Sequence, residues 1–189
     1  MMKERIPTMH ILAISGSLRA VSLNSALLRA AIQLAPTDVD IALYDGLGTL
    51  PLFNPDLEGA EPAAVMDFRA RLQAADGVLI ASPEYTHGVT GAMKNALDWV
   101  VASAEFVDKP VALLNTAPRA TIALAALTET LTVMSARLVA DASITLPIVG
   151  SSALDEAGML ADAEIAGALR IALAAFVRAI LTQPELITS

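Results

Sequence analysis

Ser15–Ser25, with the sequence SGSLRAVSLNS, is the stretch around which the chain is organised. A short apolar run from Ile11 to Ile14 precedes it, and a helix-periodic segment begins near Asn24. A buried strand that leads into a helix leaves unpaired backbone N–H groups at the helix N-terminus, where the helix dipole favours an anion. The turn also carries one cation and a set of hydroxyl and amide side chains, and it therefore predicts a phosphate site. These side chains are Arg19, Ser15, Ser17, Ser22, Asn24 and Ser25.

A capped turn without a ligand is the alternative, because Ser22 or Asn24 alone would serve as an ordinary N-cap. A cap needs one such residue, whereas this turn has several together with an arginine, which favours the anion site. The turn lacks the Gly-Lys-Ser/Thr ending of a P-loop. Gly16 also lacks the partner glycines of the dinucleotide fingerprint. We therefore expect an anion other than a P-loop nucleotide or a dinucleotide held by such glycines.

Composition excludes several classes of protein. Hydrophobic residues make up 55% of the 189 residues and charged residues 17%, which excludes an intrinsically disordered chain. This length suits one three-layer domain, which we expect to span residues 1–189. The net charge of −8 and the lack of a basic stripe argue against nucleic acid or an anionic membrane surface as a partner.

Metal, disulfide and membrane chemistry also have no support in the sequence. There is no cysteine, and His10 and His87 are too isolated to form a metal centre. The apolar run that follows Lys3 and Arg5 is too short for a signal peptide. No uninterrupted apolar run approaches the length of a membrane span. The sequence therefore predicts a soluble, cytoplasmic protein without a metal site.

Short apolar runs and helix-periodic segments alternate along the chain. The sequence predicts strands at residues 10–14, 41–44, 77–82, 111–115 and 143–147. It predicts helices at residues 24–34, from 62 to about 75, at 90–102, along the apolar stripe 124–138, and at 162–181. Residues 47–61 contain several prolines and glycines and are expected to form a surface loop.

This alternation predicts an α/β fold with a doubly wound, parallel five-stranded sheet between two layers of helices. Five strands favour the order 2-1-3-4-5, in which the chain reverses its winding direction between strands one and three. Ligands of such sheets bind beyond the carboxyl ends of the strands at that switch point. Ser15–Ser25 and Ser82–Gly91 follow these two strands, and we expect them to meet there.

The second of these stretches continues as SPEYTHGVTGAMKNALDWV, from Ser82 to Val100. Such a loop can present Tyr85 as a stacking face and its backbone N–H groups to a ring system. Alternatively, Tyr85 lies at the rim and merely covers the end of the sheet. His87 is most simply an exposed loop histidine, since no partner is evident that would make it a catalytic acid. Trp99 is expected in the core or at a subunit contact.

These stretches resemble the NADPH-dependent FMN reductase family, a family of flavodoxin-like oxidoreductases that includes quinone, chromate and azo-dye reductases. The resemblance extends from His10 to about Pro147 and implies a flavodoxin-like fold. Three segments carry it: GSLRAVSLN at residues 16–24, LPLFNPDLE at residues 50–58, and PEYTHGVTGAMKNALDW at residues 83–99.

The resemblance implies FMN as the cofactor and NAD(P)H as the co-substrate. It implies two sets of contacts, one with the FMN phosphate and one with the isoalloxazine ring, the latter largely through backbone groups. The phosphate would be held by Ser17, Arg19, Asn24 and Ser25, and the ring would be lined by Pro83, Glu84, Tyr85 and Thr86. It also implies a homodimer or homotetramer, with the third helix near the subunit contact and the partner chain helping to close the site.

Three departures from the family pattern affect the expected contacts. The family typically has Asn where Thr86 stands, Pro where Thr90 stands, and a glycine-rich loop where residues 115–119 read NTAPR. Missing glycines restrict the approach of the backbone to a ring system. We expect Arg119 to compensate by reaching the cofactor or the phosphate of the nicotinamide nucleotide.

The leading functional prediction is an FMN-dependent NAD(P)H oxidoreductase that transfers hydride through the flavin to a small acceptor. The acceptor is a free flavin, a quinone, an azo or nitro compound, or a metal oxyanion. No catalytic side chain is expected, because the cofactor carries the chemistry. A non-enzymatic flavodoxin-like electron carrier or flavin-binding sensor is the first alternative. A phosphate-binding or structural domain that has lost the flavin is the second.

Overall fold

The computed structural model describes residues 8–148 and 155–182. The segment around Lys3 and Arg5, to which the signal-peptide argument applied, lies outside these residues. Within the described ranges, none of the helices has the length and apolar character needed to cross a membrane.

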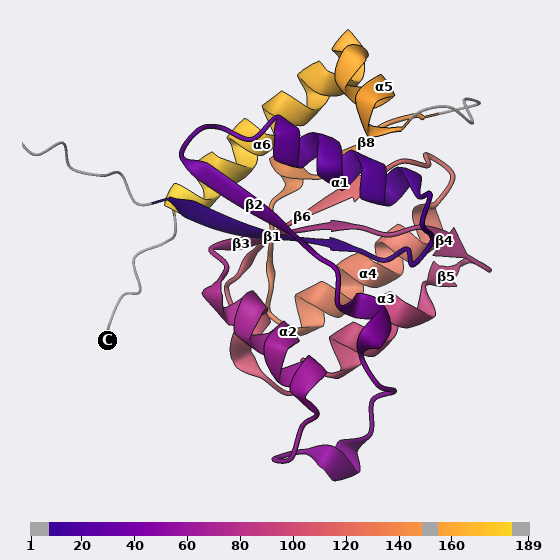
Figure 1. The fold of residues 1–189 in the computed structure, drawn as a ribbon, viewed down its shortest axis with the longest axis vertical. Helices are drawn as coiled ribbons and strands as arrows, with labels where there is room; N and C mark the ends of the chain where they lie inside the picture. The colour runs from indigo at the N-terminus through magenta and orange to yellow at the C-terminus, as the bar shows by residue number, and fades with distance from the viewer. Residues whose placement is uncertain (1–7, 149–154, 183–189) are drawn as a thin grey trace, which may run out of the picture.

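A mainly parallel sheet forms the middle layer (Figure 1). Its strands are β1 (Met9–Ser15), β2 (Val39–Tyr44), β3 (Gly77–Ala81), β6 (Pro110–Asn115), β7 (Arg137–Leu138) and β8 (Ile144–Thr145). The strand order is β2-β1-β3-β6-β7, and β8 also pairs with β6. The predicted order 2-1-3-4-5 is confirmed, because β7 and β8 together take the place of the expected fifth strand.

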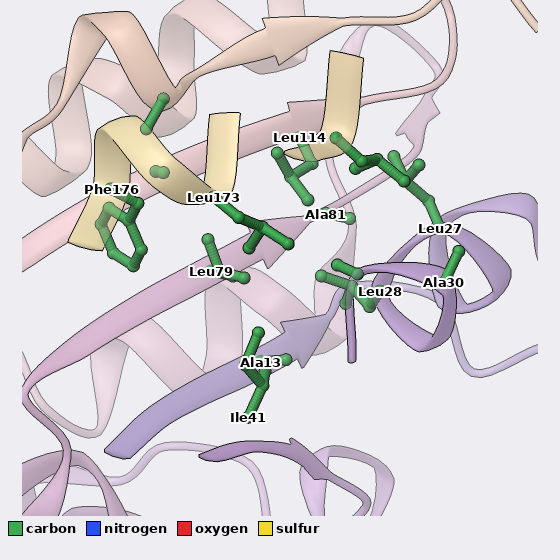
Figure 2. Close-up of a cluster of buried hydrophobic side chains, with 14 of the residues drawn as sticks. Ala13, Leu27, Leu28, Ala30, Ile41, Leu79, Ala81, Leu114, Leu173 and Phe176 are labelled. Atoms are coloured by element: carbon green, nitrogen blue, oxygen red, sulfur yellow. The ribbon is translucent and has the colours of Figure 1, made fainter. Parts of the chain in front are cut away.

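Helices cover both faces of the sheet (Figure 1). The helices are α1 (Leu23–Gln33), α2 (Ala63–Ala74), α3 (Gly91–Asp98), α4 (Thr121–Val133), α5 (Glu156–Ala161) and α6 (Ala163–Leu181). Successive residues of β1 point to opposite faces: Ile11 and Ala13 pack with α1 and α6, whereas Leu12 and Ile14 pack with α2, α3 and α4. Figure 2 shows the first of these clusters, in which Leu27 and Phe176 approach the strands from two different helices. Burial on both faces explains why the strand sequences do not alternate with polar residues.

Three boundary predictions were wrong. The strand expected at residues 143–147 is shorter than predicted and consists of Ile144–Thr145 (β8). The strand β7 precedes it, across a 3-10 turn at Ala140–Ala142, and was not predicted. The helix expected to include Leu138 ends at Val133, because Ser135 adopts a left-handed φ of 60° that an α-helix does not tolerate. The helix expected to reach residue 102 ends at Asp98, and the short helix α5 was not predicted.

The loop at residues 47–61 contains 3-10 turns at Leu47–Thr49 and Pro55–Leu57 and packs against α3. The side-chain amide of Asn95 donates to the carbonyl oxygen of Pro51 at 2.9 Å and accepts from the N–H of Phe53 at 2.8 Å. The indole N–H of Trp99 donates to the same Pro51 oxygen at 2.7 Å, and the Trp99 side chain is buried, as expected for a core residue. This irregular segment is therefore held in place by side chains of a helix.

Candidate functional site

Buried polar side chains of the described residues gather at one end of the sheet. They lie at or beyond the carboxyl ends of β1, β3 and β6, which meet at that edge, and they include Ser15, Ser17, Ser22, Asn24, Ser25, Thr90, Asn115 and Thr116. A buried polar group destabilises a fold unless it is hydrogen-bonded or faces a ligand or water. Because ligands of doubly wound sheets bind beyond the carboxyl ends of the strands, this concentration of polar side chains makes the edge the candidate binding site.

An open cavity of about 700 Å³ lies at this edge, within the size range of small-molecule sites. Both stretches singled out in the sequence contribute to it. Its lining includes Ser17, Arg19, Asn24, Pro83, Tyr85 and Thr116. The two stretches thus meet at the switch point between β1 and β3, as the strand order predicts.

We call residues 15–25 the phosphate turn, and their internal hydrogen bonds define its shape. Ser22 caps α1 by accepting from the N–H of Ser25 at 3.4 Å, and the hydroxyls of Ser15 and Ser25 are 2.8 Å apart. Among the described residues, the backbone N–H groups of Leu23 and Asn24, in the first turn of α1, donate to no protein acceptor. Unpaired N–H groups at a helix N-terminus, beside an arginine, fit a phosphate group.

The hydroxyl of Thr116 donates to the side-chain oxygen of Asn24 at 3.4 Å. This bond assigns the amide oxygen of Asn24 to Thr116 and leaves its NH₂ group available to the cavity. Thr116 follows β6 directly and was not among the predicted site residues. Its position at the carboxyl end of a neighbouring strand is the signal that would have identified it.

A short antiparallel hairpin, which was not predicted, follows β3. Its strands are β4 (Glu84–Tyr85) and β5 (Gly88–Val89), and its turn is formed by Thr86 and His87, with left-handed φ values of 52° and 55°. We call residues 83–90 the ring hairpin. It lies at the same edge of the sheet as the start of α1 (Figure 1).

The Glu84 side chain connects the ring hairpin to α4. One carboxylate oxygen accepts from the N–H of Ala123 at 2.8 Å, in the first turn of a helix that has no capping side chain of its own. The other oxygen lies 3.0 Å from Nδ1 of His87. The N–H of Ala123 lowers the pKa of Glu84 below its ordinary value, and His87 adds to this effect. His87 therefore has a carboxylate partner that the sequence did not reveal, although its side chain is largely exposed.

The predicted site residues fall into two groups. Ser17, Arg19, Asn24, Pro83 and Tyr85 line the cavity. The remaining four lie outside its lining: Ser25 is bonded to Ser15, Glu84 is bonded to α4, Thr86 is in the turn of the ring hairpin, and Arg119 is exposed after β6. For every residue of both groups, contact with a cofactor remains a prediction.

We expect Thr86→Asn to raise the free energy of unfolding by about 1 kcal/mol. A β-branched residue is disfavoured at positive φ, whereas Asn adopts this region more readily. Urea denaturation of the cofactor-free protein measures the effect. The matched control is Thr132→Asn on the exposed surface of α4, where no positive φ is relieved and no gain is expected. An equal change in the two variants would contradict backbone strain at Thr86 as the cause.

A doubly wound sheet with a cavity at its switch point, lined by hydroxyl and amide side chains together with Arg19, defines a flavodoxin-like α/β protein. The chain belongs to the NADPH-dependent FMN reductase family, whose family model matches residues 9–149. The family match confirms the resemblance noted in the sequence. It also supports FMN as the cofactor and NAD(P)H as the electron donor.

Named relatives are flavin and quinone reductases. Over 108 residues, covering 56% of this chain, the chain is 45% identical to an NAD(P)H-dependent FMN reductase of Pseudomonas aeruginosa. Over 115 residues, covering 58% of this chain, it is 43% identical to an NADPH:quinone oxidoreductase of Arabidopsis thaliana. The matched segments span 58% and 59% of the length of these two relatives, less than two thirds.

A solved structure extends the similarity over almost the whole fold. The flavoenzyme FerB of Paracoccus denitrificans, an NAD(P)H:(acceptor) oxidoreductase, superimposes with a TM-score of 0.78 and 28% sequence identity. The match covers 93% of this chain and 98% of FerB. The similarity therefore includes the elements that form the cavity.

Proposed function

We propose that this chain is an FMN-dependent NAD(P)H oxidoreductase that reduces a small electron acceptor: a flavin, a quinone, an azo or nitro compound, or a metal oxyanion. One observation carries the proposal. The unpaired N–H groups of α1 and Arg19 belong to the same cavity as Pro83 and Tyr85 of the ring hairpin. A phosphate-binding end and a flat, partly apolar end in one cavity suit a molecule with a phosphate and a ring system.

The residues of the phosphate turn would bind the FMN phosphate. Arg19 supplies a positive charge, Ser17 a hydroxyl, and Asn24 the NH₂ group that Thr116 leaves free. Ser25 would contribute indirectly, because its hydroxyl is hydrogen-bonded to the Ser15 hydroxyl. The hydroxyl of Ser17 and the NH₂ group of Asn24 would bind the phosphate by short-range hydrogen bonds. Such bonds can hold an anion although the whole chain has a net charge of −8.

The ring hairpin would place the isoalloxazine. Pro83 and Tyr85 border the cavity, and Glu84 and Thr86 would contribute backbone groups rather than side chains, since the Glu84 carboxylate is engaged by α4. Arg119, exposed on the β6–α4 loop, would reach the cofactor or the phosphate of NAD(P)H. Bound FMN supplies the redox chemistry, the transfer of electrons from NAD(P)H to the acceptor.

We further propose one FMN-binding domain over residues 1–189, acting in the cytoplasm as a homodimer or homotetramer in which a second copy helps to close the cavity. Exposed apolar side chains at the cavity support this assembly. Val21 and Tyr85 line the cavity and are 84% and 51% exposed, and Leu18, in the same turn, is 62% exposed. Such side chains are typical of a surface that another molecule covers.

The test is an absorption spectrum of the purified protein after incubation with FMN and desalting, before and after anaerobic NADPH and, separately, NADH. We expect a retained flavin band that bleaches with at least one nucleotide, followed by steady-state nucleotide oxidation with a quinone. A retained band without turnover would favour an electron carrier. Absence of both the band and nucleotide oxidation would contradict the proposal.

A further inference from the structure

We propose that Thr90 is a positioning residue that fixes the phosphate turn from the opposite side of the switch point. Its hydroxyl couples the ring hairpin and α3 to the residues that precede α1. This inference deepens the proposed function and rests on it only for the identity of the ligand. The hydrogen bond between Thr90 and Gly16 is present in the protein without a cofactor.

The hydrogen bonds of Thr90 reach in two directions. Its Oγ1 donates to the carbonyl oxygen of Gly16 at 2.7 Å, across 74 residues of sequence, and accepts from the N–H of Met93 at 3.3 Å as the N-cap of α3. The residue is 4% exposed, so water does not replace either bond easily. The shorter bond is the one that crosses to the phosphate turn.

The backbone of Gly16 is held on both sides by the β3–α3 segment. Its N–H donates to the carbonyl oxygen of Ala81 at 2.9 Å, and its carbonyl oxygen accepts from Thr90. The segments are so close here that a Cβ on Gly16 would lie 2.2 Å from the hydroxyl oxygen of Ser82. The phosphate turn therefore begins at a point whose position is set by residues far along the chain.

The orientation fixed at Gly16 extends to the start of α1. In a trans peptide the C=O and the following N–H point in opposite directions, so the bond from Thr90 also directs the N–H of Ser17. That N–H lies 3.3 Å from the Ser15 hydroxyl, which is 2.8 Å from the Ser25 hydroxyl in the first turn of α1. A connected set of bonds thus runs from Thr90 to the helix N-terminus.

Loss of the Thr90 hydroxyl would leave the buried carbonyl of Gly16 without its donor and release the peptide that follows. Phosphate donors that are ordered before binding lose less entropy when the ligand arrives. Thr90 would therefore raise the affinity for the phosphate group without touching it.

The test compares Thr90→Val with Thr90→Ser, which keeps the hydroxyl, and with Thr132→Val, which removes a threonine hydroxyl from the exposed surface of α4. Amide hydrogen exchange of the cofactor-free protein, followed by NMR, is the first readout. In Thr90→Val we expect about tenfold faster exchange at Gly16, Ser17 and Ser25, with exchange at Leu79 in β3 unchanged. Thr90→Ser and Thr132→Val are expected to match the wild type at these positions.

FMN affinity, measured by quenching of flavin fluorescence, is the second readout. We expect the Kd of Thr90→Val to rise about tenfold and that of Thr90→Ser to return close to the wild-type value. Faster exchange at Met93 alone would overturn the coupling, because loss of the α3 cap would then explain the data. An equal increase at Met93 and Leu79 would overturn it too, because lower global stability would then explain the data. If the wild type binds no FMN, the proposed function fails, while the exchange data still test the role of Thr90.

Thr90→Ala removes the same hydroxyl and leaves a smaller side chain. It replaces Thr90→Val in both measurements if Thr90→Val does not fold.

Discussion

Gly16→Ala is expected to lower the free energy of unfolding by about 2 kcal/mol and to abolish tight FMN binding. An added Cβ would lie 2.2 Å from the Ser82 hydroxyl oxygen and 2.7 Å from the Ser82 Cβ, closer than non-bonded atoms approach. The loops after β1 and β3 would have to separate, and overpacking of this kind usually costs 1–3 kcal/mol, hence the estimate of about 2 kcal/mol. The separation would also lengthen the bond from the N–H of Gly16 to Ala81 and shift the phosphate turn.

Urea denaturation and an FMN titration measure the two effects of Gly16→Ala. The matched control is Gly167→Ala in α6, where an added Cβ meets no atom within 4 Å and helix propensity predicts a gain of up to about 1 kcal/mol. Adding Ser82→Gly to Gly16→Ala removes the two nearest clashing atoms and is expected to restore part of both losses. Wild-type stability and affinity in Gly16→Ala would contradict the close approach.

Asn24→Asp is expected to weaken FMN binding by about 3–4 kcal/mol, on the order of a hundred- to a thousandfold, while the cofactor-free protein keeps its stability to within about 1 kcal/mol. The substitution changes an NH₂ donor at the cavity into a carboxylate oxygen that repels the phosphate. The acceptor for the Thr116 hydroxyl is retained, and a negative charge in the first turn of α1 is favourable to the helix dipole.

The contrast between affinity and stability distinguishes repulsion of the phosphate from simple unfolding. Fluorescence titration gives the affinity, and denaturation without FMN gives the stability. Gln33→Glu is the matched control, since it adds the same charge at the exposed last residue of α1 and leaves the cavity unchanged. Unchanged affinity in Asn24→Asp would mean that the phosphate is bound elsewhere.

The order of the sheet could be predicted because the strands are continuous apolar runs separated by helix-periodic segments. The end of α4 could not, because Leu138 continues the 3–4 spacing of the helix although the chain turns at Ser135, a residue that does not signal positive φ. The ring hairpin was missed for the same reason: Thr86 and His87 replace the Asn-Gly type of turn that would have revealed it.

The phosphate turn was recognisable because its polar residues are adjacent in sequence. Glu84, Thr90 and Thr116 act through single hydrogen bonds to distant segments, at Ala123, Gly16 and Asn24. An isolated threonine or glutamate has no local pattern that distinguishes such a role from an exposed surface residue. Thr116 could have been singled out by its place directly after β6, and Glu84 was expected at the site, but their hydrogen-bond partners and the role of Thr90 became evident only in the tertiary structure.

The polar cluster combines three segments that are far apart in the sequence, and this separation has a consequence for biosynthesis. At roughly 5–20 residues per second, Thr116 is synthesised about 5–20 s after Ser22. For most of that interval the phosphate turn exists without Thr90 and β1 lacks β3 as a neighbour, and Thr116 is absent throughout. A ligand of this cavity therefore cannot guide early folding of the nascent chain. It stabilises the protein by mass action only after the central strands have been released and paired.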